Sequence, residues 1–175
     1  MIEIRPATTT DASAIAHVHI ESWRTTYRGI IADEYLDAMA AETRVDSWLE
    51  LLKHADQTTF VALDAHKNVV GFANAGPERM GRTDFCGELY AIYLLPDARG
   101  RQTGRRLVAE TVNWLRDRNL DSLIVWVLRD NPYRAFYETL SGKQVDEKEI
   151  HIAGQGLIEV AYGWEDSKAL TGISS

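Results

Sequence analysis

Hydrophobic and polar residues follow two kinds of pattern along this chain, and each pattern predicts a different kind of element. Apolar residues spaced three or four positions apart predict amphipathic helices over residues 12–23, 32–39, 42–54, 107–118 and 131–140. Short runs rich in branched and aromatic residues, bounded by turn residues, predict strands over residues 1–5, 58–63, 69–75, 88–95, 122–128, 144–152 and 157–164.

The order of these elements, β-α-α-α-β-β-β-α-β-α-β-β, predicts an α+β domain. Strands that follow one another directly, such as those on either side of the polar turn 64–68, predict hairpins. The sheet should therefore be mixed and mostly antiparallel, with helices on both faces. We expect a single domain over residues 1–175, because no repeat or linker interrupts the pattern, with a frayed polar tail at residues 166–175.

Composition narrows the classes of protein that this domain can belong to. A chain of 175 residues that is 45% hydrophobic can bury a substantial core. Its net charge of −7 is opposite to the basic footprint of a nucleic-acid-binding protein, so we expect no nucleic-acid partner. We expect no membrane partner either, because no apolar run is long enough to span a bilayer and the first residues do not form a signal sequence.

The cysteine and histidine content points to a cytoplasmic protein without a metal. The single cysteine, Cys86, excludes an internal disulfide and agrees with a reducing compartment. A nucleophilic role for Cys86 has no support from a neighbouring histidine, and a small buried side chain is the alternative. The five histidines are scattered and form no metal-binding pattern.

The most distinctive chemistry lies between the strand 88–95 and the helix 107–118. Four arginines and two glycines occur within eight residues directly before the helix. Glycines allow the backbone to turn its N–H groups inward, the first helical turn adds unpaired donors, and arginines pair with phosphate oxygens. The residues predicted to form this phosphate site are Arg99, Gly100, Arg101, Gln102, Thr103, Gly104 and Arg105.

Three alternatives bear on this turn. A solvated basic loop without a ligand would have the same composition. A nucleoside-triphosphate P-loop needs Lys followed by Ser or Thr after its last glycine, whereas Arg105 and Arg106 follow Gly104 here. The three-glycine dinucleotide fingerprint is absent.

Two sequence blocks resemble the GNAT N-acetyltransferase superfamily. Arg99-x-x-Gln102-x-Gly104, after the strand 88–95, is similar to the acetyl-CoA-binding pattern Arg/Gln-x-x-Gly-x-Gly/Ala, with Gln102 in place of the middle glycine. The second block is Asn131-Pro-Tyr-Arg-Ala-Phe-Tyr137-Glu, followed by Gly142. The resemblance implies a GNAT-type fold in which the strands 88–95 and 122–128 diverge and leave a slot for the pantetheine arm of acetyl-CoA.

The resemblance also implies roles for individual residues in holding the cofactor. The turn from Arg99 to Arg105 would present N–H groups to the pyrophosphate, and the backbone of Leu94 would bond the pantetheine. The side-chain amide of Asn131 would bond the same arm. Asn131 has an alternative as a helix cap before Pro132, and both roles are compatible.

Tyr137 and Glu88 are the predicted catalytic residues. By the resemblance, Tyr137 would donate a proton to the leaving thiolate, and the alternative is a core aromatic beside Phe136. Glu88 would act as general base on the substrate ammonium, directly or through water. The alternative for Glu88 is a solvated strand-edge residue, or one paired with an arginine such as Arg79 or Arg82. Strand alternation places Glu88 on one face with Cys86, Tyr90 and Ile92.

The acceptor site is predicted from aromatic residues. Trp23, Tyr27 and Tyr90, together with Ile30, Tyr93 and the loop 76–83, are candidates to line it, with core packing as the alternative. The resemblance then implies transfer of an acetyl group from acetyl-CoA to a primary amine by direct attack. The acceptor would be a small molecule or a protein or peptide amine, and the family's frequent dimers suggest a homodimer. Two hypotheses compete with this one. The first is a non-catalytic acyl-CoA-binding regulator on the same fold, and the second is a purely structural interaction domain.

Overall fold

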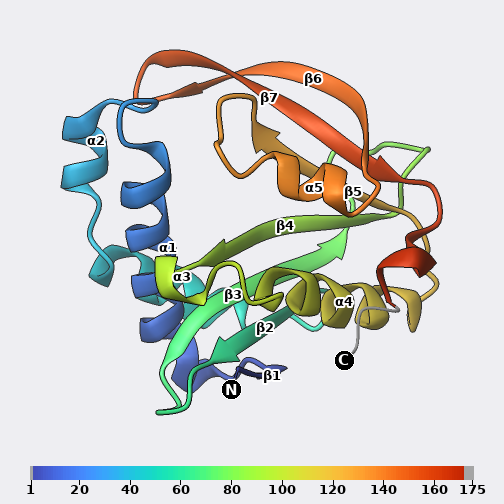
Figure 1. The fold of residues 1–175 in the computed structure, drawn as a ribbon, viewed down its shortest axis with the longest axis horizontal. Coiled ribbons are helices and arrows are strands. Elements are labelled where there is room, and N and C mark those ends of the chain that lie inside the picture. Colours follow the sequence, from blue (N-terminus) through green and yellow to red (C-terminus); the bar gives the residue numbers. More distant parts are fainter. Residues whose placement is uncertain (1, 172–175) are drawn as a thin grey trace.

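A computed structural model describes residues 2–171 of the chain. Its strands form a single seven-stranded sheet in the order β1-β2-β3-β4-β5-β7-β6 (Figure 1). They are β1 (Glu3–Pro6), β2 (Thr58–Leu63), β3 (Val69–Pro77), β4 (Gly87–Leu94), β5 (Leu123–Leu128), β6 (Lys143–Ile152) and β7 (Gln155–Trp164). All neighbouring strands are antiparallel except β4 and β5, which are parallel. The predicted mixed, mostly antiparallel sheet is confirmed.

Helices cover both faces of this sheet, as the sequence predicts (Figure 1). The helices are α1 (Ala12–Tyr27), α2 (Asp33–Ala38), α3 (Glu42–Leu51), α4 (Thr103–Arg116) and α5 (Ala135–Thr139). The side chains of β2 alternate between two hydrophobic cores, one on each face of the sheet. Phe60 and Ala62 pack with α4 and α5, while Val61 and Leu63 pack with α1 and α3. In residues 2–171, no helix has the length and apolar character needed to cross a bilayer.

The parallel strands β4 and β5 separate after a short contact. They are paired only over residues 87–89 of β4 and 123–125 of β5. Beyond that point β4 continues beside β3 as far as Leu94, and β5 continues beside β7 as far as Leu128. The C-terminal half of β4 therefore has an unpaired edge, which is the divergence that the sequence resemblance implies.

A β-bulge in β4 changes which side chains share a face. Asn74 of β3 pairs with Ala91 and the next residue pairs with Leu89, so Tyr90 is the extra residue on β4. Ile92 consequently packs with Leu89 on the α4 side of the sheet, whereas Ala91 lies on the α1 side. The prediction that Glu88 and Ile92 share a face is wrong, because the bulge shifts the alternation by one residue.

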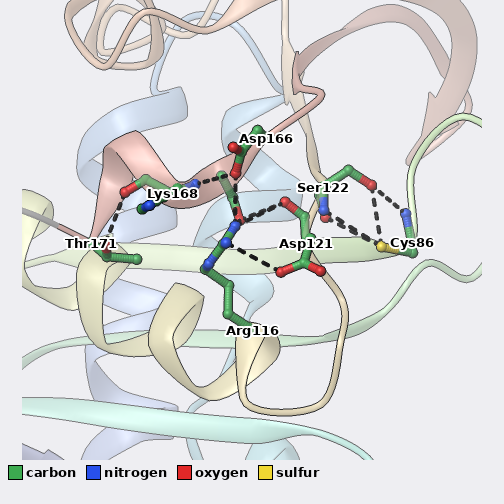
Figure 2. Close-up of polar contacts among 8 residues, drawn as sticks. Cys86, Arg116, Asp121, Ser122, Asp166, Lys168 and Thr171 are labelled. Carbon is green, nitrogen blue, oxygen red and sulfur yellow. Dashed lines mark hydrogen bonds and ion pairs between the residues drawn. The ribbon is translucent and has the colours of Figure 1, made fainter.

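The C-terminal segment is more ordered than predicted, since residues 167–170 form a 3-10 helix, η3 (Ser167–Leu170). Leu170 is 1% exposed and packs in the α4-side core, and the Ser167 N–H donates to Asp121 O at 2.8 Å. Figure 2 shows the Arg116 guanidinium between Asp121 and Asp166, with its Nη1 2.8 Å from Asp166 Oδ1. The expectation of a frayed tail is wrong for these residues, and residues 172–175 lie outside the described part.

The bounds of α5 and β4 differ slightly from the prediction. Helix α5 covers only Ala135–Thr139, because residues 132–134, beginning with Pro132, form turns. Strand β4 begins at Gly87 and ends at Leu94, one residue earlier at each end than predicted. Cys86 lies just before β4, where its N–H donates to Ser122 Oγ at 2.9 Å and its Sγ lies 3.2 Å from the same oxygen (Figure 2). These contacts join the starts of β4 and β5 on the side opposite to the divergence.

Candidate active site

A cavity of about 380 Å³ opens at the divergence of β4 and β5, where α1, α4 and α5 converge. Its lining residues are Ser22, Thr26, Ile92, Tyr93, Leu94, Arg99, Gly100, Gln102, Thr103, Gly104, Arg105, Asn131, Tyr133, Phe136 and Tyr137. The structure thus brings two segments about 30 residues apart, the basic turn and the 131–137 block, to one cavity. Six residues predicted for the site do not line it, and neither does the predicted loop 76–83. The six are Trp23, Tyr27, Ile30, Glu88, Tyr90 and Arg101.

The basic turn has the backbone geometry of an anion site. Gly100 and Gln102 have φ values of 71° and 59°, so both adopt the left-handed conformation. The first backbone bond into α4 comes from the Arg106 N–H, which donates to Gln102 O at 3.0 Å. The N–H groups of residues 103–105 therefore have no helical acceptor and are available at the positive end of the helix.

Thr103 adds an unsatisfied hydroxyl to this helix terminus. Its side chain lines the cavity, the residue is 1% exposed, and its Oγ1 has no hydrogen-bond partner in the described chain. A buried hydroxyl is normally paired, because leaving it unpaired costs free energy. The donors here fit an acidic, phosphate-bearing ligand, which would satisfy both the hydroxyl and the free N–H groups.

Gly104 is required by the close approach of α4 to its neighbours. A Cβ at this position would lie 3.2 Å from Phe136 Cζ and 3.5 Å from Leu94 Cδ1. Both neighbours also line the cavity. A side chain at residue 104 would therefore enter the space between the helix terminus and β4.

The arginines of the turn hold the mouth of the cavity together. Arg99 Nε donates to Leu94 O at 3.0 Å, and its guanidinium lies 4.4 Å from the ring centroid of Tyr133. Arg105 Nη2 donates to Thr139 O at 2.9 Å. Arg101 is exposed and has no ion-pair partner in the part of the chain that the structure describes. Of these three side chains, Arg101 is the one not already engaged by the protein.

The backbone of Leu94 faces the unpaired edge of β4. The Leu95 N–H donates to Val70 O at 2.9 Å, toward β3. Successive residues direct their backbone groups to opposite edges of a strand, so those of Leu94 point away from β3. Arg99 already binds the Leu94 carbonyl, so the Leu94 N–H is the backbone group that remains for a ligand.

Asn131 lines the cavity and also makes the capping bond that was its alternative role. Its Oδ1 accepts from the Tyr133 N–H at 2.8 Å, and its Nδ2 donates to Tyr27 Oη at 3.0 Å. One amide hydrogen remains, so the capping role and a ligand contact are compatible. Tyr27 lies behind the cavity lining and fixes the orientation of this amide.

Tyr137 is a buried phenol in the cavity wall. Its ring lies between Phe136 and Tyr162, at centroid distances of 5.5 and 5.7 Å. Burial raises its pKa well above the usual phenol value, with a further increase from nearby Tyr93. The side chain is therefore protonated at neutral pH, which is the state that a proton donor requires.

Aromatic residues of α1 form the wall behind Tyr93. Trp23 Nε1 donates to Tyr93 Oη at 2.9 Å, and the rings of Trp23 and Tyr27 are 5.2 Å apart. Burial raises the pKa of both Tyr27 and Tyr93. Trp23 and Tyr27 thus support the cavity from its outer layer, while Tyr93 contacts the space directly.

Glu88 is held in an ion pair, which was the alternative to its role as a base. Its side chain is almost completely buried, and its Oε1 accepts from Arg79 Nη2 at 2.6 Å. Its Oε2 accepts from the Arg79 N–H at 3.1 Å and from Nε at 3.2 Å. Arg79 also lies over the ring of Tyr90, 3.9 Å from the centroid, and Tyr90 Oη donates to Pro77 O. A base role for Glu88 would require Arg79 to move away.

Ser22 and Thr26 are cavity residues that the sequence analysis did not select. They lie one turn apart on the inner face of α1, and both are buried. Two hydroxyl residues on the apolar face of an amphipathic helix are a detectable signal, although core packing produces the same pattern. Among the described residues, no three His, Cys, Asp or Glu side chains form a group that could bind a metal ion.

Comparisons with known proteins agree with this architecture. Residues 17–142 match the model of the Acetyltransferase (GNAT) family. The chain is 39% identical over 170 residues to the uncharacterized N-acetyltransferase YuaI of Bacillus subtilis (strain 168), covering 97% of this chain and 96% of that one. The chain therefore belongs to the GNAT acetyltransferase family, and the family assignment from the sequence is confirmed.

Solved structures show the same fold. The PaiA N-acetyltransferase of Thermoplasma acidophilum, in complex with coenzyme A, superposes with a TM-score of 0.72 at 22% identity, covering 94% of this chain and 99% of that one. A ribosomal-protein-alanine N-acetyltransferase of Brucella melitensis gives a TM-score of 0.72 at 26% identity, covering 93% of this chain and 98% of that one.

Proposed function

We propose that this chain transfers the acetyl group of acetyl-CoA to a primary amine by direct attack within a ternary complex. The observation that carries the proposal is the terminus of α4, where free N–H groups and the unpartnered Thr103 hydroxyl open into a cavity that reaches Tyr137. Bound coenzyme A in the similar PaiA structure supports the choice of cofactor. Acetyl-CoA supplies an activated acetyl thioester when bound.

The residues of the cavity divide between holding the cofactor and assisting the transfer. The N–H groups of residues 103–105 and the Thr103 hydroxyl would bind the pyrophosphate, with Arg101 adding charge from outside. The free Leu94 N–H and the remaining Asn131 amide hydrogen would bind the pantetheine arm. These contacts would hold the cofactor in the cavity and so reduce the entropic part of the barrier.

In the proposed reaction an uncharged amine nitrogen forms a bond to the acetyl carbon while the carbon–sulfur bond breaks. The electron pair of that bond leaves with the sulfur, which takes one proton, and the nitrogen releases one proton to solvent. Tyr137 would supply the proton to the sulfur, because it lines the cavity and its phenol is protonated at neutral pH. The acceptor is a small amine or the amino group of a peptide.

Thiol release in the presence of acetyl-CoA and a panel of primary amines tests the proposal. Tyr137→Phe should lower kcat by about 100-fold, the lower end of the range for general acid catalysis, with acetyl-CoA affinity nearly unchanged. Tyr162→Phe is the matched control, since this neighbouring ring does not line the cavity. Unchanged turnover in Tyr137→Phe would remove the proton-donor role. Acetyl-CoA binding without thiol release from any amine would favour the regulatory acyl-CoA-binding domain instead.

A further inference from the structure

The α1 wall of the cavity contains an unsatisfied hydroxyl that the proposed reaction has not used. Ser22 is 1% exposed, lines the cavity, and its Oγ has no hydrogen-bond partner among residues 2–171. Serine and threonine in helices usually donate to a carbonyl three or four residues earlier. Thr25 of the same helix does so, since its Oγ1 donates to Glu21 O at 2.9 Å. Ser22 therefore differs from its neighbour in presenting a free hydroxyl to the cavity.

We propose that Ser22 binds the acceptor amine, and that the amine binds there in its uncharged form. The assignment rests on the proposed acetyltransferase function. In this arrangement an N–H of the amine donates to Ser22 Oγ, which leaves the nitrogen lone pair free to attack the acetyl carbon. Thr26, one turn further along α1, forms the adjacent part of the same wall.

The position of Ser22 separates it from the groups assigned to the cofactor. The helix residues on either side of it contact Tyr93: His19 stacks on that ring at 5.2 Å, and Trp23 Nε1 donates to its hydroxyl at 2.9 Å. Tyr93 belongs to the α1 side of the sheet, whereas Tyr137 and the first turns of α4 belong to the opposite core. Ser22 therefore lines the α1 side of the cavity, away from Tyr137 and α4, and this is the side that the cofactor groups would leave for a second substrate.

The charge of the lining indicates the class of acceptor. Of the described residues, no Asp or Glu lines the cavity, and its charged members, Arg99 and Arg105, belong to the basic turn. Tyr93 of β4 and Tyr137 of α5 also line the cavity, and burial raises the pKa of both, so they are neutral. Glu159 of β7 does not line the cavity, but its negative charge adds to the increase in the pKa of Tyr93. The Glu159 carboxylate lies 3.5 Å from Lys148 Nζ. An ammonium would thus be buried without an anion at its side, which is unfavourable, whereas an uncharged amine would not.

Steady-state kinetics with each substrate varied in turn separate the possible roles of Ser22. With glycinamide as the acceptor, Ser22→Ala should lower kcat/KM for the amine about three- to tenfold, the effect of losing one neutral hydrogen bond. The dissociation constant of acetyl-CoA, measured by calorimetry, should stay unchanged. Thr25→Ala is the matched control, because it removes a hydroxyl from the same helix outside the cavity and should leave both values unchanged.

Four results would overturn the assignment. Unchanged amine kinetics in Ser22→Ala, with normal turnover, would show that the hydroxyl has no acceptor contact. A weaker acetyl-CoA affinity in this variant would show that the Ser22 hydroxyl contacts the cofactor instead of the amine. Propylamine, a stronger base that is less often uncharged at neutral pH, should have the higher KM, and the reverse order would refute binding of the uncharged form. Absence of thiol release by the wild-type protein with both amines and the rest of the panel would refute the underlying function, and the acceptor assignment with it.

Discussion

Replacing Gln102 by glycine should stabilise the protein. Gln102 precedes α4 with φ 59° and ψ 5°, the left-handed conformation that places a Cβ too close to the following carbonyl. The GNAT pattern has glycine at this position, and glycine adopts this backbone conformation without strain. The Gln102 side chain is exposed, so its removal sacrifices little packing.

The expected gain is about 1 kcal/mol in the free energy of unfolding. A non-glycine residue in the left-handed conformation costs about 1–2 kcal/mol, and part of the gain is offset by the greater freedom of glycine in the unfolded chain. In a protein of this size, about 1 kcal/mol corresponds to a rise in Tm of about 2–4 °C.

Gly100→Ala provides the matched comparison in the opposite direction. Gly100 has φ 71°, and a Cβ built there meets no heavy atom within 4 Å, so its substitution tests backbone conformation without steric conflict. Gly100→Ala should lower the free energy of unfolding by about 1 kcal/mol. Urea denaturation of both variants measures these values. A Gln102→Gly protein no more stable than wild type would refute the reasoning, and so would a neutral Gly100→Ala.

Two further predictions concern the helix terminus and the α1 core. Gly104→Glu should abolish measurable acetyl-CoA binding in a folded protein, because the side chain enters the space beside Phe136 and carries negative charge to the proposed anion site. Calorimetry tests this, and retained affinity would contradict the phosphate assignment. Burial lowers the pKa of His19 from 6.5 to about 4, so stability present above pH 6.5 should be lost as the pH falls toward 4. Urea midpoints of His19→Phe should lose this acid dependence, while those of exposed His17→Gln should keep it; equal dependence in both variants would contradict the buried-histidine explanation.

Much of the fold could be predicted because local patterns and long-range packing agree. The apolar run at the end of residues 58–63 predicts a strand, and the structure buries the side chains on both faces of β2. The basic turn was found because its glycines and arginines are contiguous in sequence. The second block was found through its resemblance to a family, and its position at the same cavity follows from the divergence of β4 and β5.

The features that were missed depend on contacts between distant segments. The bulge at Tyr90 is a property of the pairing between β4 and β3, so alternation within one strand could not reveal it. Leu170 is buried only because the chain returns to α4 and to the segment before β5, where the Ser167 N–H donates to Asp121 O. The choice between a free and a paired Glu88 depended on where the loop containing Arg79 folds. Ser22 required knowledge that its hydroxyl has no partner.

Calorimetric titration of acetyl-CoA into the wild-type protein and into Gly104→Glu tests the central claim most directly. The claim predicts saturable binding at one site per chain, with a dissociation constant below about 1 mM, the upper end of common substrate affinities, and no binding by the folded variant. Equal binding by both proteins would place the cofactor elsewhere. No binding by the folded wild-type protein would contradict the assignment of the α4 terminus as a cofactor site.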